Sequence, residues 1–599
     1  MTRLERLRLR TLSSFNPLVP VLNLFGVQVK HDLLQQHDKA QLGYGIDPNF
    51  RNDSRPVRLG WTDVAAVAVL IYLVVQLITC SNRMSATYDE QYHIANGLNF
   101  LRRGDPSLVP EHPPLIDLIT ALPLLADRDL ILPPAFGSPD DINSLAFSDQ
   151  LVWKLNPNGP SIISRARAPI MVLTVFLGLV VYAWARELYG SAAALLVLTL
   201  LAFDPNILAH GCLATNDIGV TCFVTMSLYA FWRWKREPSI GKAAIAGLAF
   251  GLAQISKFSA LFLVPVIVIT LFVDWISDRV AQTNRQPIKR TVQHLAVASL
   301  SAAFTIWAGY GFQVGTLKGY AVPARAYLTG LQSLTQLVES GKESFLLGSY
   351  SELGWWYYFP IAFAVKTPLP TLLLIVCSLV YVYNRRTWRI SLPLLIPITV
   401  YFGTSMLSHF NVGYRHLLPI LPLIFIFVGQ LAGIEWRTSQ KRAWAICLSV
   451  VWLVVGSLQI QPHYLTFFNE LVGGPRGGYR VLLDSNLNWG QELIELRDYL
   501  ARENITSVKL SYLGTADPAA YGIIYEPLPG YPYHQWHGDD VPEILLKPPN
   551  GMYAISASLL QGSRLENHNL YAAFRVRKPD AIVGNSIFVY RISDTIERP

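Results

Sequence analysis

Two short polar clusters follow the first long apolar segment of the chain. The first reads Tyr88-Asp89-Glu90-Gln91-Tyr92-His93. If this run is helical, Glu90 and His93 lie three residues apart and Asp89 and His93 four apart, so each pair shares a face. Such a spacing lets a carboxylate and an imidazole bind one divalent ion, or lets an aspartate act as a base beside a metal. A helix-capping aspartate would look the same in the sequence.

The second cluster, Glu111-His112-Pro113-Pro114, lies in the same loop. The two prolines restrict the backbone, so Glu111 and His112 are held in an extended presentation. An ordinary loop turn is the alternative. Glu111 could share a divalent metal with His93 of the first cluster and with His210, which lies near the next predicted turn on the same membrane face.

Further polar side chains stand where other apolar segments reach this face. Asp204 and Asp217 flank His210, and both could instead cap helices. Lys257, Lys366 and Arg415 lie at predicted membrane boundaries. Cations at this depth suit a lipid phosphate, although residues that merely anchor a helix by snorkelling look alike. Together these groups predict an acid–base or metal centre beside a phosphate-binding rim.

The elements that position these residues are membrane helices. The chain has 599 residues, of which 51% are hydrophobic and only 15% charged, with a mean hydropathy of +0.31. A soluble chain carries about a quarter charged residues. Apolar runs such as 61–80 and 168–185 match a bilayer core of about 30 Å. The composition therefore predicts a multi-pass integral membrane protein.

Hydropathy predicts an all-α bundle of about eleven transmembrane helices. The predicted spans are 61–80, 168–186, 191–209, 215–233, 241–256, 258–275, 293–313, 356–383, 391–407, 414–434 and 443–460. Basic residues gather in alternate loops, which predicts a cytoplasmic N-terminus. The same distribution accounts for the net charge of +8 without nucleic acid, because the basic residues form no binding face.

Three regions are predicted outside the bilayer. Residues 1–60 form a cytoplasmic N-terminal segment, and residues 61–460 form the transmembrane domain with a catalytic outer loop at 81–167. Residues 461–599 alternate helix and strand patterns and predict a small extracytoplasmic α/β domain. In this tail, Asp484, Asn488 and Trp489 are candidate acceptor-binding residues, since amides bond hydroxyls and an indole stacks on a sugar. A turn with Asn488 as a helix cap explains them equally well.

Several motifs resemble those of membrane glycosyltransferases with the C-type fold, in the protein O-mannosyltransferase and lipid A aminoarabinose transferase superfamily. The resemblance covers roughly residues 60–435. It rests on Tyr88-Asp89-Glu90, His112-Pro113-Pro114-Leu115, Asp204-Pro205-Asn206 with His210-Gly211 and Asp217, Gly247 to Ala260, and Arg415-His416-Leu417-Leu418-Pro419. The run Asp484 to Gln491 resembles an extension found on many bacterial relatives.

The resemblance implies inverting transfer of a sugar from a polyprenyl-phosphate donor. It makes Asp89 the base that deprotonates or orients the acceptor hydroxyl, and Glu111 a second acid that binds metal or donor phosphate. Glu90 and Asp217 belong to the matching motifs and are further catalytic candidates. His112 replaces the lysine of the aminoarabinose transferases, which argues against aminoarabinose as the sugar. His112 then joins Arg415, Lys366 and Lys257 as candidate phosphate-binding residues.

These expectations describe an enzyme of a bacterial inner membrane, with its active site on the periplasmic face. Its partners would be a lipid-linked sugar donor, membrane lipids and a protein, lipid or glycan acceptor. The alternative is a transporter or flippase of lipid-linked sugars, which would need its charges near the midplane and usually repeated halves. An inert scaffold and an enzyme that transfers whole oligosaccharides also remain open.

Overall fold

The fold is known from a computed structural model that describes residues 60–135, 143–281, 288–317, 319–433, 440–538 and 540–593. Residues Gly60–Ile276 and Gln286–Pro599 form one compact unit, which holds every candidate site residue. The predicted cytoplasmic segment 1–60 lies outside the described residues except for Gly60.

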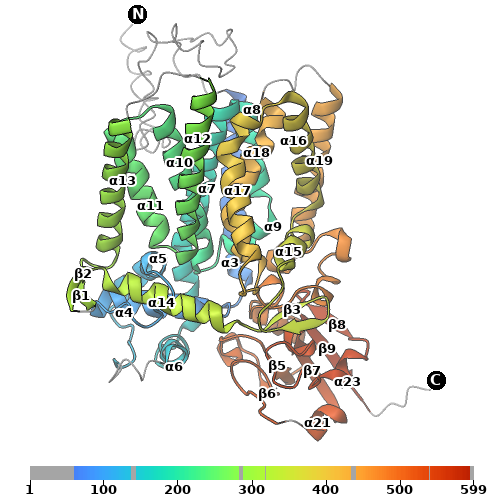
Figure 1. Cartoon of the computed structure of the whole chain (residues 1–599). Coiled ribbons are helices and arrows are strands. Elements are labelled where there is room, and N and C mark those ends of the chain that lie inside the picture. Colours follow the sequence, from blue (N-terminus) through green and yellow to red (C-terminus); the bar gives the residue numbers. More distant parts are fainter. Residues whose placement is uncertain are drawn as a thin grey trace, which may run out of the picture. The chain divides into compact units, whose positions relative to one another are not determined.

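A bundle of helices forms the larger part of this unit (Figure 1). Its main helices are α3 (Trp61–Arg83), α7 (Gly159–Tyr189), α8 (Ser191–Ala202), α10 (Asn216–Arg236), α11 (Ile240–Gln254), α12 (Leu263–Ala281), α13 (Ile288–Gly309), α15 (Tyr358–Lys366), α16 (Leu369–Arg385), α17 (Trp388–Met406), α18 (Leu421–Gly433) and α19 (Gln440–Ile460). Among the described residues, six helices are long and apolar enough to cross a membrane, or seven if the bent pair α15–α16 counts as one span. The chain is therefore an integral membrane protein, and the count of eleven stays a prediction.

The shorter helices show why the count from hydropathy is larger. Helix α8 has 12 residues and α11 has 15, whereas about 20 residues are needed to cross about 30 Å at 1.5 Å per residue. The predicted span 191–209 is broken after α8, because Asp204 caps a separate helix, α9 (Pro205–His210). Asp204 Oδ1 accepts hydrogen bonds from the backbone N–H groups of Asn206 and Ile207.

The loops that carry the polar clusters lie at one end of the helices (Figure 1). The loop after α3 contains α4 (Glu90–Arg103), α5 (Leu115–Ala121) and α6 (Ser144–Asp149), and the amphipathic helix α14 (Arg325–Ser340) crosses the same end. Two hairpins flank α14, formed by β1 (Val314–Leu317) with β2 (Tyr320–Pro323) and by β3 (Ser344–Leu346) with β4 (Ser349–Ser351).

The tail folds as a five-stranded mixed sheet with short helices. The strands are β5 (Val508–Ser511), β6 (Tyr525–Pro527), β7 (Gly551–Ser556), β8 (Ala581–Val583) and β9 (Ile587–Ile592), in the order β6-β5-β7-β9-β8. β5 pairs in parallel with β6 and β7, while β9 pairs antiparallel with β7 and β8. The sequence patterns of Ser507–Leu513, Met552–Ile555 and Ser586–Ile592 predict strands, and these ranges overlap β5, β7 and β9. Helix α20 (Leu493–Arg502) packs its leucines inward.

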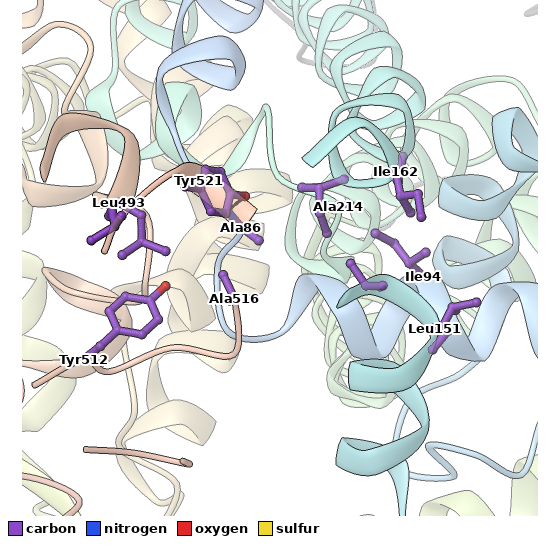
Figure 2. Packing of buried hydrophobic residues seen from close by; sticks show 14 of the residues in the cluster. Ala86, Ile94, Leu151, Ile162, Ala214, Leu493, Tyr512, Ala516 and Tyr521 are labelled. Carbon is purple, nitrogen blue, oxygen red and sulfur yellow. Dashed lines mark hydrogen bonds between the residues drawn. The ribbon is translucent and has the colours of Figure 1, made fainter. Parts of the chain in front are cut away.

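The tail shares one hydrophobic core with the loop after α3. Ile94 and Leu151 of the loop belong to the same buried cluster as Leu493, Tyr512 and Tyr521 of the tail (Figure 2). Ala86, directly before the first polar cluster, is also part of it. Burial of apolar surface stabilises a fold by about 25 cal/mol per Å², so loop and tail stabilise each other.

Candidate active site

A cavity of about 570 Å³ opens where the loop after α3, α14 and the ends of the helices meet. Its polar lining comes from several segments distant in sequence: Asp89, His93, Glu111, His112, Asn216, Lys257, Lys342, Arg415 and His416. Its apolar wall includes Leu331, Leu334 and Leu337 of α14. This size is typical of small-molecule sites, which combine an apolar lining with a few placed polar groups.

Asp89 precedes α4, but its side chain does not cap that helix. Its Oδ2 atom accepts a hydrogen bond of 2.7 Å from Nη1 of Arg415, at the start of η6 (Tyr414–Ile420). Burial favours the neutral acid, but the Arg415 guanidinium, together with His93 and Lys342, outweighs burial and holds the pKa of Asp89 below its usual value. Asp89 is therefore ionised and can accept a proton.

Arg415 belongs to a chain of alternating charges. Its Nη1 atom also lies 3.5 Å from Oδ2 of Asp217, in the first turn of α10. The other oxygen of Asp217 accepts a 2.6 Å hydrogen bond from Nζ of Lys257. Asp89, Arg415, Asp217 and Lys257 thus form two carboxylates and two cations, which we call the charge quartet. The sequence predicted these four residues for one site, and the structure brings them together.

Glu90 lies outside this cavity although it adjoins Asp89. Its carboxylate is fully buried and accepts two hydrogen bonds of 2.7 Å from Nε and Nη2 of Arg167, in α7. It also accepts from the backbone N–H groups of Thr87 and Ala214. The hydroxyl of Thr87 is a fifth donor. A carboxylate with five donors has no lone pair directed at a substrate, so Glu90 holds the loop against α7.

Glu111 and His112 both line the cavity. Burial raises the pKa of Glu111 above its usual value. Burial, reinforced by the nearby His93, lowers the pKa of His112 to about 3, so this imidazole is neutral. His112 Nδ1 lies 3.3 Å from Nδ2 of Asn216, which can donate to it. A neutral imidazole binds phosphate only by hydrogen bonding, not by charge.

The three candidate metal ligands do not form a metal site. Nδ1 of His93 is 2.7 Å from Oδ1 of Asp117, whose other oxygen bonds Asn96. Burial disfavours the imidazolium, but Asp117 outweighs it and raises the pKa of His93. His210 packs its ring against Trp489, 6.2 Å away, and does not line the cavity. No group of three His, Cys, Asp or Glu side chains that could hold a metal occurs in the described parts of the chain.

Lys366 and the tail residues also lie outside the cavity lining. Lys366 is 2% exposed, and its Nζ donates to the backbone carbonyls of Leu465 and Asn486. Asn488 is buried and donates to Ser586 Oγ. Asp484 forms an ion pair with Arg564. Trp489 is 2% exposed beneath Arg415, whose guanidinium lies 4.3 Å from the ring centroid.

Lys342 is a cavity residue that the sequence analysis did not single out. It follows α14, and its ammonium lies 5.6 Å from the centroid of the Phe410 ring. Across the described ranges, no ion pair to Lys342 is found. Burial lowers its pKa below the usual value. The sequence does contain one signal for Lys342. A lysine in a predicted outer loop is unusual, because such loops contain few lysines.

The sequence of one helical segment matches a family model. Residues 161–307 match the model of the dolichyl-phosphate-mannose-protein mannosyltransferase family. The matched segment is about a quarter of the chain. It runs from α7 to α13 and contains Asp217 and Lys257, so the mannosyltransferase family match covers half of the charge quartet. The resemblance expected from the motifs is confirmed.

Solved structures of two related kinds are similar to the chain. ArnT from Cupriavidus metallidurans bound to undecaprenyl phosphate is 12% identical, with a TM-score of 0.45 over 90% of this chain and 99% of that chain. The oligosaccharyltransferase of Archaeoglobus fulgidus in the apo form is 13% identical, with a TM-score of 0.42 over 67% and 55% of the two chains. No curated protein matches significantly. Similarities this weak carry no functional conclusion.

Proposed function

We propose that this chain transfers a sugar from a polyprenyl-phosphate donor to an acceptor hydroxyl by inverting displacement. The observation that carries the proposal is the charge quartet at the cavity, in which an ionised Asp89 stands beside cations that can bind phosphate. The matched mannosyltransferase family supports the class of donor. The apolar residues of α14 in the cavity wall suit a polyprenyl chain.

In the proposed reaction, the acceptor oxygen attacks C1 of the sugar from the side opposite the phosphate. The new bond from C1 to the acceptor oxygen forms while the bond from C1 to the phosphate oxygen breaks. Asp89 takes the proton of the hydroxyl, and polyprenyl phosphate leaves with the electron pair of the broken bond. Glu111, the second carboxyl group in the cavity, is positioned to hydrogen-bond either the sugar or the acceptor.

The leaving phosphate gains negative charge, which nearby cations must offset. The quartet alone is neutral, because its two carboxylates balance its two cations. Lys342 supplies an additional positive charge when it is protonated. Arg415 Nε and His416 Nε2 are buried and make no hydrogen bond within the described part of the protein. A phosphate oxygen could accept from Arg415 Nε, and a guanidinium can bind phosphate through two parallel hydrogen bonds.

The proposed setting is a bacterial inner membrane with the cavity on the periplasmic side. The support is the pattern of basic loops, which predicts eleven spans and an exterior tail. Reporter fusions after Lys342 and after Leu513 should both report the outside. A cytoplasmic signal from either fusion would overturn this topology.

The proposal is tested with the purified chain in detergent and a panel of undecaprenyl-phosphate monosaccharides. Without the natural acceptor, water takes the sugar at C1, so we expect slow release of undecaprenyl phosphate and free sugar with at least one donor, and loss of that turnover in Asp89→Asn. Mass spectrometry of glycans, glycolipids and glycoproteins from cells with and without the chain would then identify the acceptor. A flippase of lipid-linked sugars would bind donors without turnover. That outcome, or full activity of Asp89→Asn, would contradict the proposal.

A further inference from the structure

The backbone that leads into Asp89 is held by the tail rather than by its own loop. We call residues 85–88 the strap, since they join α3 to Asp89. The backbone N–H groups of Ser85 and Tyr88 donate to the carbonyls of Gln491 and Trp489, at 2.9 and 2.8 Å. These bonds tie both ends of the strap to the same short segment of the tail.

Side chains add to this attachment. The N–H group of Ala86 donates to the hydroxyl of Tyr521 at 2.9 Å. Ser85 Oγ donates to the carbonyl of Gly490, and the hydroxyl of Thr515 donates to the carbonyl of Tyr88. Figure 2 shows Tyr521 and Ala516 of the tail beside Ala86. Ser85, Ala86 and Tyr88 of the strap are therefore each hydrogen-bonded to the tail.

The approach of the two segments is close enough to require a glycine. Gly490 has a φ of +97°, which side-chain-bearing residues rarely adopt. A Cβ atom at this position would lie 2.8 Å from Tyr512 Oη and 3.2 Å from the carbonyl oxygen of Ala86. The tail backbone is thus fitted against the strap.

The same segment also holds the partner of Asp89. The indole of Trp489 lies under the Arg415 guanidinium, at 4.3 Å from its ring centroid. A desolvated contact of this kind stabilises the cation. The Nη1 atom of Arg415 that donates to Asp89 also lies 3.5 Å from Oδ2 of Asp217, so the indole helps to hold the guanidinium in its position between the two carboxylates.

We infer that residues 489–491 of the tail position the catalytic pair, with the indole of Trp489 setting the guanidinium of Arg415 and the backbone of this segment fixing the strap before Asp89. This inference rests on the proposed role of Asp89 as the base. It assigns Trp489 a role in the chemistry through Arg415 and not in binding the acceptor, because a ring 2% exposed under a guanidinium has no free face for a sugar.

Removal of the Trp489 indole would change the pKa of Asp89 in one direction. The charged and titratable groups that interact with Asp89 are Arg415 and His416 from η6, Tyr92 and His93 from α4, Glu111 and His112 from the segment before α5, and Lys342 from the segment after α14. If Arg415 turns toward Asp217, Asp89 keeps its burial and loses its nearest cation. Its pKa would then rise, and a higher pH would be needed to ionise the base.

The test compares full-length Trp489→Phe and Trp489→Leu with the wild type, using the undecaprenyl-phosphate monosaccharide that the wild type consumes fastest. Initial rates are measured across pH, and thermal stability is measured in the same detergent. We expect Trp489→Leu to lower kcat/KM by roughly 10- to 100-fold, as for a small displacement of reacting groups. The acid limb of the profile, where kcat/KM falls as the pH is lowered, should also move to higher pH. Trp489→Phe should keep part of the rate because it retains an aromatic face.

Trp536→Ala is the matched control, since Trp536 is an exposed tryptophan of the same tail whose Nε1 donates a hydrogen bond to the carbonyl of Asp540. It should behave as the wild type. A folded Trp489→Leu with normal rates and an unchanged acid limb would overturn the inference. If neither Trp489 variant folds, Tyr521→Phe decides, because it removes only the hydroxyl that holds Ala86. Its acid limb should also move upward, and an unchanged profile would refute the inference.

Asp89→Asn separates this inference from the proposed function. If Asp89→Asn is inactive and Trp489→Leu is normal, Asp89 remains the base and only the positioning role of the tail is lost. If Asp89→Asn is fully active, both proposals fail.

Discussion

Two adjacent carboxylates of the loop after α3 lie in opposite surroundings. Asp89 faces the cavity and accepts a hydrogen bond from one guanidinium. The polar side chains around it also line the cavity, where they can contact a ligand. Glu90 points into the protein, where Arg167 and two backbone N–H groups occupy both of its oxygens. Arg167 in turn donates to the carbonyls of Ser81, Met84 and Ser85. The same motif thus supplies one group for chemistry and one for structure.

The difference follows from the start of α4. Consecutive residues at a helix start point about 100° apart, since a helix has 3.6 residues per turn. Asp89 therefore faces η6 and the cavity while Glu90 faces α7. Because a saturated ion pair cannot release its carboxylate without a large cost, only Asp89 retains the freedom that a base requires. The following variants test this division.

The largest expected effect is on turnover in Asp89→Asn. The amide keeps the shape of the carboxylate but cannot take a proton, and general-base catalysis contributes about 10²- to 10⁴-fold. Initial rates of undecaprenyl phosphate release should fall by that factor. Binding of undecaprenyl phosphate, measured as the shift that it causes in the midpoint of thermal unfolding, should persist. A rate within a few fold of wild type would show that Asp89 is structural, like Glu90.

Glu90→Gln should instead reduce stability. The change leaves the buried Arg167 without its counter-charge, and breaking a buried pair costs about 3–5 kcal/mol. The midpoint of thermal unfolding in detergent should drop clearly. Glu495→Gln is the control, because Glu495 pairs with Arg502 at the surface, where ion pairs contribute about 0–1 kcal/mol. Unchanged stability in Glu90→Gln combined with lost turnover would assign Glu90 to the chemistry.

Arg415→Lys should weaken donor use although the charge is kept. A lysine cannot form the two parallel hydrogen bonds that a guanidinium makes to phosphate. We expect KM for the donor to rise on the order of 10-fold, which corresponds to about 1.4 kcal/mol, and to rise further in Arg415→Ala. Lys366→Met is the contrasting variant, because Lys366 lies outside the cavity lining. It should lower stability and leave donor KM unchanged.

Lys342→Gln should have a smaller effect on the same parameter. Lys342 lines the cavity, and burial lowers its pKa, so its charge is lost at a lower pH than that of an ordinary lysine. We expect donor KM to rise by roughly 3- to 5-fold, less than 1 kcal/mol. The difference from the wild type should be largest at low pH, where Lys342 is protonated, and should shrink as pH rises through its pKa. Donor KM measured at several pH values checks this. No change at any pH would remove Lys342 from the phosphate site.

The smallest effect is a displacement of the acid limb of the wild-type profile. A base must be ionised, so kcat/KM falls as pH drops through the pKa of that base in the free enzyme. Arg415 lowers the pKa of Asp89, so the limb should lie below the usual range of an aspartate. Burial raises the pKa of Glu111. A limb above the usual range of a glutamate would therefore point to Glu111 as the base.

The sequence alone was enough to predict the membrane location and the residues of the charge quartet. Long apolar runs need a bilayer or a partner, and isolated charges beside them need a function, so both signals are local. The strands β5, β7 and β9 could likewise be predicted from the sequence, because alternating apolar and polar residues and β-branched side chains mark each strand within a few positions. The family resemblance was also carried by short local motifs, and residues 161–307 bear it out.

Only the tertiary structure decided which of the candidate residues face the cavity and which hold the fold together. Asp89 and Glu90 are equivalent in the sequence, and only the positions of Arg415 and Arg167, far along the chain, distinguish them. In the same way, Trp489 suggested a sugar-binding surface until its ring was found under Arg415. His93 suggested a metal ligand, but the described parts of the chain bring no group of three metal-ligating side chains together. Residue type and spacing specify what a side chain can do, whereas its partners come from chain segments whose approach no local pattern encodes.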